Sequence, residues 1–476
     1  MKKFIATAFA LMFLTSCGRV ESANNISQEK SMSTTAETSA PTTEIPPTAP
    51  IETDVLTSET AETTVQQTSL LQTSATAVNR ITVPAENFVT ETIPVTLPQN
   101  EFVTTPVTVQ EAEIPQIMPT NPAAAQAVYI KSDAEIKLDK MTLHEKVCQM
   151  FIVVPEAING YDNTTYVDCA FHSGYAEYPV GGLILFANNI DNSAQTATMV
   201  TDMQNDALFA GIGAFMAVDE EGGSITRIQS QLGTQAVYDM NYYGNLNDWN
   251  TAFEVGGIIG SYLAEYGFNL DFAPVADVNI SPYNELGSRI FSTDPQIVAD
   301  MSGAVVDGMQ SQGVCSTLKH FPGLGAGSSN THYNSVWIDR TYEQLVETEF
   351  VAFKGGIDAG SDFVMVGHQI VSASGDNLPS DLSRVVVTDW LRNELGFNGI
   401  AVTDSHAMGA ISNVYTSGES AVMAIEAGID MILMPDSLTE AVAGVEQAVQ
   451  SGRISESRIN ESVLRILEKK DELGLI

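Results

Sequence analysis

The longer, C-terminal part of the chain alternates short apolar runs, rich in β-branched residues, with amphipathic stretches long enough to form helices. Eight such runs occur, at 151–154, 182–186, 214–218, 270–275, 314–318, 363–366, 400–403 and 431–434. Buried parallel strands read as continuous apolar runs of this length, and the helix-sized intervals supply the crossover connections. The pattern therefore predicts an α/β fold, a (β/α)8 barrel of the TIM type. An open, doubly wound sheet is the alternative.

Residues 18–127 carry a different pattern, without apolar periodicity. Thr, Ser, Pro, Glu and Ala dominate this segment, which contains neither Trp nor Tyr. Such a composition cannot bury enough apolar surface to offset the loss of chain entropy on folding. We therefore expect a disordered N-terminal stalk over 18–127, followed by a single folded domain over 128–476.

The first 17 residues have the pattern of a bacterial lipoprotein signal peptide. Lys2 and Lys3 precede an apolar run at 4–14 that is too short to span a bilayer. The Leu-Thr-Ser-Cys segment that follows resembles a lipobox, which implies cleavage before Cys17 and lipidation of that cysteine. We expect an extracytoplasmic protein that meets the bacterial cell membrane only through this anchor. The alternative is that Cys17 stands by chance near an ordinary cleavage site.

The charge of the chain restricts its partners. The sequence holds 21 basic and 59 acidic residues, a formal net charge of −38. Only part of this surplus lies in the stalk, so the folded domain is itself acidic. A chain of this charge disfavours nucleic acid and anionic lipid as partners. A neutral, hydroxyl-rich ligand is compatible with it.

Polar residues recur where successive apolar runs end. In a barrel of parallel strands, functional groups lie at the carboxyl ends of the strands. The residues at these places are Asp219, Asp277, the pair Lys319 and His320, His368, and Asp404. Any one of them alone is as well explained as a helix cap or a satisfied core histidine. Because they recur in successive units, we expect them to share a pocket.

A glycine-rich stretch follows the fifth run, with the sequence KHFPGLGAGSSNTH at 319–332. A loop of this composition can carry a titratable group, His332, into a pocket and move it. The glycines at 323–327 also allow a dinucleotide-binding loop, but an isolated pattern of this kind is weak. Pro322 before it and the polar residues after it weaken that alternative further.

Many ordered segments of the chain resemble glycoside hydrolase family 3, of the single-domain β-N-acetylhexosaminidase type. The segments are LDKMTLHEKVCQMF, GGLILFANNI, VDEEGGSITR, NLDFAPVADVN, GSRIFSTDP, KHFPG, LRNELGFNGIAVTDSHAMGAI, AGIDMILMP and GRISESRINESVLRILEKKDELGL. The resemblance implies a TIM-like barrel over this region, hydrolysis with retention of configuration, and no metal or organic cofactor.

The resemblance also assigns roles to residues. Asp404 matches the nucleophile of the family, and His332 matches the histidine that serves as acid/base in this branch. The positions that match sugar-binding groups are Asp219, Arg227, Arg289, Lys319 and His320. His368 is a further candidate for contact with the sugar because of its place at a strand end. A structural ion pair of the two arginines with Asp219 or Asp294 is the alternative.

The residue types suit the chemistry. Retaining hydrolysis of a glycoside needs a carboxylate that attacks the anomeric carbon and a second group that protonates the leaving oxygen and then activates water. Asp404, directly after a buried run, suits the first task, although an N-cap is its structural alternative. His332 suits the second, because an unperturbed imidazole has a pKa of roughly 6.5.

Two residues of the loop depart from the pattern of the family. Members of this branch usually carry an aspartate two residues before the loop histidine and a histidine after the KHFPG segment. Here these positions hold Asn330 and Leu324. An aspartate stabilises a protonated imidazole, whereas an asparagine can orient the ring through its amide oxygen without supplying charge. We expect Asn330 to orient His332 and the acid/base to be weaker than in relatives.

These observations support one leading function and several alternatives. The leading hypothesis is a monomeric, surface-anchored exo-β-N-acetylglucosaminidase. It would act on peptidoglycan fragments or chitin-like oligosaccharides through a covalent intermediate on Asp404. The alternatives are a carbohydrate-binding pseudoenzyme on the same fold, a β-glucosidase, and a phosphorylase that uses phosphate in place of water.

Overall fold

The structure, a computed structural model, describes residues 131–476. The signal peptide predicted for 1–17, the lipid-bearing Cys17 and the stalk predicted for 18–127 lie outside the described residues. These expectations, and the domain boundary at 128, remain predictions.

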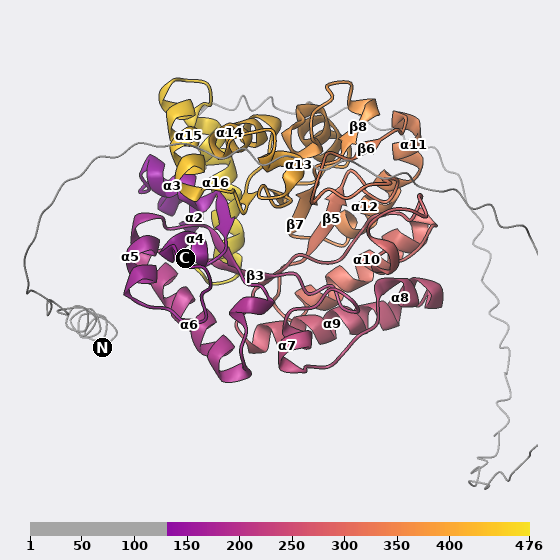
Figure 1. The fold of residues 1–476 in the computed structure, drawn as a ribbon, viewed down its shortest axis with the longest axis horizontal. Helices are drawn as coiled ribbons and strands as arrows, with labels where there is room; N and C mark the ends of the chain where they lie inside the picture. The colour runs from indigo at the N-terminus through magenta and orange to yellow at the C-terminus, as the bar shows by residue number, and fades with distance from the viewer. Residues whose placement is uncertain (1–130) are drawn as a thin grey trace, which may run out of the picture. The chain divides into compact units, whose positions relative to one another are not determined.

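Eight parallel strands form a closed ring at the centre of the domain, surrounded by helices (Figure 1). Five strands pair in the order β10-β1-β2-β3-β4, and three pair in the order β5-β7-β9. Isolated parallel bridges join the two sheets, Leu270 with Cys315 on one side and Val402 with Met431 on the other. The prediction of a (β/α)8 barrel is confirmed, and the open doubly wound sheet is excluded.

The barrel strands are β1 (Phe151–Val153), β2 (Gly182–Ile184), β3 (Phe215–Val218), β4 (Leu270–Asp271), β5 (Thr317–Phe321), β7 (Phe363–Val366), β9 (Ile400–Thr403) and β10 (Ile432–Leu433). The short pair β6 (Trp337–Ile338) and β8 (Ile370–Val371) lies outside the barrel sheets.

The helices are α2 (Asp133–Leu138), α3 (Leu143–Gln149), α4 (Glu156–Asn159), α5 (Cys169–Glu177), α6 (Ser193–Ala210), α7 (Ile228–Leu232), α8 (Met240–Leu246), α9 (Trp249–Glu265), α10 (Pro295–Gln310), α11 (Tyr342–Glu347), α12 (Glu349–Asp358), α13 (Gly409–Ser412), α14 (Ser417–Ala427), α15 (Leu438–Gln450) and α16 (Glu456–Glu472). Shorter or wider turns are η1 (Ala187–Asn189), η2 (Gly287–Arg289), η3 (Ser372–Ser374), η4 (Ser380–Leu382) and the π-helical η5 (Val385–Glu394).

Local sequence explains where the helices begin. Thr142 and Asp294 precede α3 and α10, and each side chain accepts a hydrogen bond from a backbone N–H of the first turn. Such caps satisfy N–H groups that have no partner within the helix. The strands between the helices are buried along their whole length. The core therefore lies between the ring of strands and the surrounding helices.

Strand β5 differs from its prediction in one respect that matters for the site. The apolar run at 314–318 placed Lys319 and His320 after the strand, but β5 extends from Thr317 to Phe321 and includes both. The backbone of Lys319 bridges to Val275 in parallel register. A lysine and a histidine are tolerated inside the strand because acidic side chains from other segments pair with them. Within residues 131–476, no helix is long and apolar enough to cross a membrane.

Candidate active site

A cavity of about 400 Å³ opens at the carboxyl ends of the barrel strands. Its size falls within the range of small-molecule sites, about 300–1,000 Å³. Seven of the predicted site residues line it: Asp219, Arg227, Arg289, Lys319, His320, His332 and Asp404. The barrel therefore gathers residues that are far apart in the sequence into a single polar cavity, as its topology requires.

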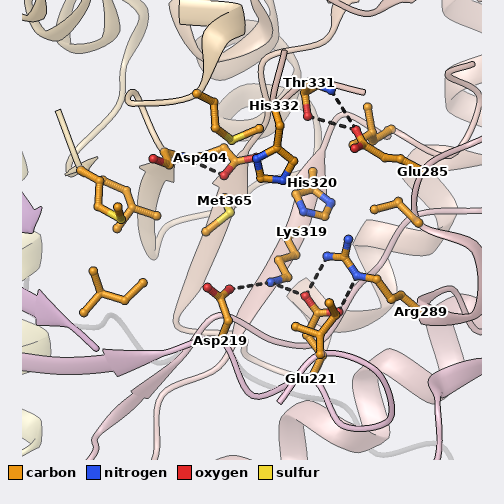
Figure 2. A pocket seen from close by; sticks show the side chains of 18 of the residues that line it. Asp219, Glu221, Glu285, Arg289, Lys319, His320, Thr331, His332, Met365 and Asp404 are labelled. Atoms are coloured by element: carbon orange, nitrogen blue, oxygen red, sulfur yellow. Dashed lines mark hydrogen bonds and ion pairs between the residues drawn. The ribbon is translucent and has the colours of Figure 1, made fainter. Parts of the chain in front are cut away.

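An acidic residue that sequence analysis missed, Glu221, organises the cations at the floor of the cavity (Figure 2). Its carboxylate accepts two hydrogen bonds from the guanidinium of Arg289, both at 2.7 Å, and it lies 2.6 Å from Nζ of Lys319. Lys319 also donates to Asp219 at 3.0 Å. Arg289 therefore pairs with Glu221, and not with Asp219 or Asp294 as the structural alternative supposed.

The charges in this cluster stabilise one another. Burial alone raises the pKa of Glu221, but Lys319 and Arg289 outweigh it and bring the pKa to about 2. For Lys319, burial lowers the pKa, and the carboxylates of Glu221 and Asp219 more than compensate. Glu221, Arg289 and Lys319 are therefore charged near neutral pH. The cluster presents fixed donors and acceptors to the cavity, a suitable surface for sugar hydroxyls.

Asp277, which does not line the cavity, binds His320 through hydrogen bonds. The Asp277 carboxylate accepts hydrogen bonds from Nδ1 of His320 at 2.8 Å and from its backbone N–H at 3.0 Å. The same carboxylate accepts from the backbone N–H of Leu324 at 2.5 Å. Because a carboxylate only accepts, Nδ1 carries the proton, and Nε2 is left for the cavity. Asp277 thus orders a cavity residue without lining the cavity itself.

Arg227 reaches the cavity from a loop that Glu220 organises. The buried carboxylate of Glu220 accepts from the backbone N–H groups of Arg227, Ile228 and Gln229 at 2.6–3.0 Å, which caps the start of α7. The guanidinium of Arg227 lies over the ring of Phe186, 5.7 Å from its centroid. It has no ion pair among the described residues and remains available to a ligand.

The loop that carries these residues needs glycine at Gly223. Its φ is +55°, and an added Cβ would lie 2.5 Å from the Cα of Asp239. Any other residue would combine backbone strain with a clash. The backbone therefore passes close to Asp239 at this point.

Asp404 directly follows β9 (Ile400–Thr403) and lines the cavity. Its Oδ1 accepts a hydrogen bond from the backbone N–H of Ser405 at 2.7 Å. Burial raises the pKa of Asp404, but His368, His320 and Lys319 together lower it below its ordinary value. The side chain is ionised near neutral pH, the form that a nucleophile requires. The hydrogen bond to the next residue does not begin a helix, because α13 starts at Gly409.

His332 lies on the glycine-rich loop and is exposed to solvent at the cavity (Figure 2). The oxygen of Asn330 accepts from the backbone N–H of His332 at 2.8 Å, so it binds the backbone and not the ring. Neither ring nitrogen forms a hydrogen bond or ion pair with a residue in 131–476. The imidazole is free to turn toward a substrate, and its orientation by Asn330 remains a prediction.

Two contacts, which we call the loop clasp, hold the His332 loop over the cavity. On one side, Glu285 accepts from the backbone N–H and the hydroxyl of Thr331 at 3.1 and 3.0 Å. On the other, the carbonyl of His332 accepts from the N–H of Gly409 at 3.0 Å. An added Cβ at Gly409 would meet the carbonyls of Tyr333 and His332 at 2.7 and 3.0 Å. The loop therefore rests on the segment that follows Asp404.

Not every predicted residue lies in the cavity. His368 is fully buried and does not line it. The charged cavity residues that sequence analysis missed are Glu221 and Glu285. The run Asp219-Glu220-Glu221 directly after a buried strand was the available signal for the first of them. Glu285 lies in an irregular segment with no signal of its own.

The cavity combines an ionised carboxylate, a free imidazole and a ring of ordered donors and acceptors. These are the groups that general acid/base and nucleophilic chemistry on a polar, neutral substrate require. In the described part of the chain, no group of three or more His, Cys, Asp or Glu residues is arranged to hold a metal ion.

Comparison with known proteins gives a consistent result. Residues 142–469 match the family model described as Glycosyl hydrolase family 3 N terminal domain. The chain is similar to Beta-hexosaminidase of Nitrosomonas eutropha, with 31% identity over 296 residues, 60% of this chain and 83% of that protein. It is also similar to Beta-hexosaminidase A of Pseudoalteromonas piscicida, with 29% identity over 325 residues, 63% of this chain. That match spans only 54% of the relative.

A solved structure shares the fold. The glycoside hydrolase family 3 beta-N-acetylglucosaminidase from Paenibacillus sp. str. FPU-7 superposes with a TM-score of 0.67 and 35% sequence identity. The superposition covers 70% of this chain and 63% of that one. The chain thus spans less than two thirds of this neighbour.

Proposed function

The chain belongs to glycoside hydrolase family 3, and on that premise we propose that it is a retaining exo-β-N-acetylglucosaminidase. Its substrates are peptidoglycan fragments or chitin-like oligosaccharides with a terminal, β-linked N-acetylglucosamine. The observation that carries the proposal is the cavity in which an ionised Asp404 and the loop histidine His332 stand among five polar side chains predicted to bind sugar. The names of the similar proteins support this substrate class.

The proposed reaction has two steps. Asp404 attacks the anomeric carbon while His332 gives a proton to the leaving oxygen, which yields a glycosyl ester on Asp404. His332, now neutral, removes a proton from water, and the hydroxide attacks the anomeric carbon and releases Asp404. Asp219, Arg227, Arg289, Lys319 and His320 hold the sugar hydroxyls during both steps.

The N-terminal sequence adds a proposal about location. The lipobox-like segment ending at Cys17 supports an extracytoplasmic, lipid-anchored enzyme, and the linker over 18–127 would separate the barrel from the membrane. Palmitate labelling of the full-length chain in bacterial cells, lost in Cys17→Ala, is the expected outcome.

The activity is tested with aryl glycosides. The full-length protein should release nitrophenol from p-nitrophenyl N-acetyl-β-glucosaminide, not from p-nitrophenyl β-glucoside, at a rate independent of phosphate. Asp404→Asn should lower kcat by at least about a thousandfold, because it removes the nucleophile. A fluorinated substrate that is turned over slowly should form a stable covalent ester on Asp404. Mass spectrometry of the peptide that contains Asp404 would detect this ester. Labelling of another carboxylate would remove the assignment.

One observation favours a second candidate, a carbohydrate-binding pseudoenzyme. The imidazole of His332 has no acidic partner within residues 131–476, because Asn330 binds the backbone. If the protein hydrolyses neither glycoside but still binds N-acetylglucosamine, that candidate is supported. A sugar phosphate product would instead indicate a phosphorylase.

A further inference from the structure

Three polar residues are buried directly behind the proposed nucleophile. His368 follows β7, Asp381 belongs to η4, and His406 follows β9. The exposed fractions of His368 and Asp381 are 0%, and that of His406 is 2%. None of them lines the cavity. We call them the buried triad.

Asp381 bridges the two histidines. Its Oδ2 lies 2.9 Å from Nε2 of His406, and its Oδ1 lies 3.1 Å from Nδ1 of His368, an ion pair without the alignment of a hydrogen bond. The other nitrogen of His406 lies 3.1 Å from the hydroxyl of Ser420. Because a hydroxyl can donate a hydrogen bond, His406 can remain neutral in this position.

His368 faces acceptors on both sides. Its Nδ1 approaches the Asp381 carboxylate, and its Nε2 lies 2.9 Å from the carbonyl of Ser405. A carbonyl cannot donate, so Nε2 carries a proton, and an unprotonated Nδ1 would place its lone pair against the Asp381 carboxylate. The geometry therefore favours an imidazolium at His368. Its pKa agrees: burial lowers it, but Asp381 and then Asp404 raise it to about 9.

The pKa values of Asp381 and His406 are consistent with a charged His368. Burial raises the pKa of Asp381, but His368 and His406 outweigh it and bring it to about 2. Burial lowers the pKa of His406 despite the nearby carboxylate. Burial and, to a smaller extent, Asp381 raise the pKa of Tyr415. The triad holds one cation, one anion and one neutral ring.

The cation is coupled to Asp404 through a single residue. The N–H of Ser405 donates to the carboxylate of Asp404, and the carbonyl of Ser405 accepts from His368. The N–H of Asp404 donates to the carbonyl of Val366 at 2.9 Å. This hydrogen bond joins the ends of β9 and β7, the strands that His406 and His368 follow. His368, His320 and Lys319 lower the pKa of Asp404 against the effect of burial, and His368 has the largest effect of the three.

We propose that the buried triad positions the nucleophile: Asp381 holds His368 as an imidazolium, and His368 fixes the Ser405 segment and keeps Asp404 anionic. This inference rests on the proposed role of Asp404. Apolar side chains of similar volume commonly stabilise a core as well as a buried ion pair does. A charged pair placed directly behind the cavity therefore points to a role in the reaction.

The test is the pH dependence of kcat/KM for Asp381→Asn in the full-length chain. The substrate is 2,4-dinitrophenyl N-acetyl-β-glucosaminide, whose leaving group needs no proton, so the acidic limb reports Asp404 and not His332. The asparagine removes the anion that keeps His368 charged. The acidic limb of the variant's pH profile should lie at higher pH than that of the wild type. At pH values below the limb, kcat/KM of the variant should be lower than that of the wild type by about tenfold for each pH unit of the shift.

Asp362→Asn is the matched control. Asp362 precedes β7, at the end of the strand remote from the cavity, and pairs with Lys469 at 2.7 Å. This variant also loses a largely buried ion pair, but its acidic limb should coincide with that of the wild type. An Asp381→Asn variant that loses activity equally at every pH, with no move of the limb, would overturn the inference.

A second measurement does not depend on activity or on folding of the variant. In the wild-type chain with ¹⁵N-labelled histidine, both ring nitrogens of His368 should appear protonated at pH 7. A neutral His368 would overturn the inference even if the enzyme is active. A wild type that is inactive on the dinitrophenyl substrate but has a charged His368 would instead refute the proposed function.

Discussion

The side chain of Asn330 binds the backbone of His332 and leaves its imidazole without a partner. This contact keeps the loop in a tight turn, as asparagine often does. It provides no charge that would favour a protonated ring. As the proposed acid/base, His332 therefore has no charged partner within residues 131–476.

An acidic residue at this position should strengthen the acid. We expect Asn330→Asp to raise kcat on p-nitrophenyl N-acetyl-β-glucosaminide about three- to tenfold and to move the basic limb of its pH profile upward, because a nearby carboxylate stabilises the imidazolium. The control is Asn334→Asp, which adds the same charge to the same exposed loop. Unchanged or lower turnover in a folded Asn330→Asp variant would count against this account.

At single residues, the sequence indicated chemistry well where a motif was complete. Asp404, Lys319 and His320 were recognisable, and all three reach the cavity. Glu221 and Asp381 were not, because their roles depend on partners brought by other strands. Lys319 reaches Glu221 across 98 positions of the chain, and no local pattern encodes that pairing.

At the scale of elements, the loop clasp fixes the position of His332, the proposed acid/base. Glu285 holds Thr331 from the segment before η2, and Gly409, the first residue of α13, holds the carbonyl of His332. Both contacts lie within one residue of the imidazole. The loop therefore has a defined resting position over the cavity without any contact to the ring itself.

Removing one side of the clasp should affect only the step that needs a proton. Glu285→Ala removes the single oxygen that accepts both hydrogen bonds from Thr331. A displaced acid/base of this kind costs about ten- to a hundredfold in rate. We expect that loss in kcat/KM on a substrate with a poor leaving group, such as p-nitrophenyl N-acetyl-β-glucosaminide. The 2,4-dinitrophenyl glycoside should be much less affected.

Glu343→Ala, which removes an exposed carboxylate on α11, provides the control and should leave both rates unchanged. Equal losses of the Glu285→Ala variant on the two substrates would argue that Glu285 binds sugar and does not position the loop.

The barrel strands were predictable from the pattern of apolar residues, except for the bounds of β5. The eight apolar runs all become barrel strands, because burial on both faces leaves a signature that is local. The predicted strand at 314–318 begins three residues before the observed β5. Lys319 and His320 are not typical strand residues, and only their pairing with Glu221 and Asp277 explains their place in the strand. Tertiary charge pairing overrode local preference there.

At the scale of the whole molecule, Lys470 connects the last helix to the inside of the barrel. Its side chain on α16 is fully buried, donates to Gln149 at 2.7 Å and lies over the ring of Phe215 at 5.0 Å. Burial holds the pKa of Lys470 well below its ordinary value. The folded state therefore binds a proton less readily at this site than the unfolded chain does.

This makes stability depend on pH in a defined direction. Between the folded pKa of Lys470 and an unfolded value of about 10.4, the unfolded chain binds more protons, so stability rises with pH. Relative to Lys470→Met, which cannot titrate, the wild type should gain up to about 1.4 kcal/mol for each pH unit in this interval. Urea unfolding of both proteins between pH 6 and 10 would measure the difference.

Lys469→Met is a control with the opposite sign. Burial lowers the pKa of Lys469, but Asp362 and Glu472 raise it above its ordinary value. The stability it provides is complete below its unfolded pKa and declines only as pH rises toward the folded value. Its difference from the wild type should therefore be constant between pH 6 and 9. A constant difference for Lys470→Met as well would contradict the account of its burial.

The loop clasp also bears on how this enzyme could be inhibited. Glu285 lines the cavity and holds Thr331 through one carboxylate oxygen, so a small molecule with a donor aimed at Glu285 would compete directly with Thr331. Such a compound would release the loop and carry His332 away from Asp404 while leaving the sugar subsite unoccupied. Drug design could therefore exploit the clasp for selectivity, since the compound would not need to mimic a sugar.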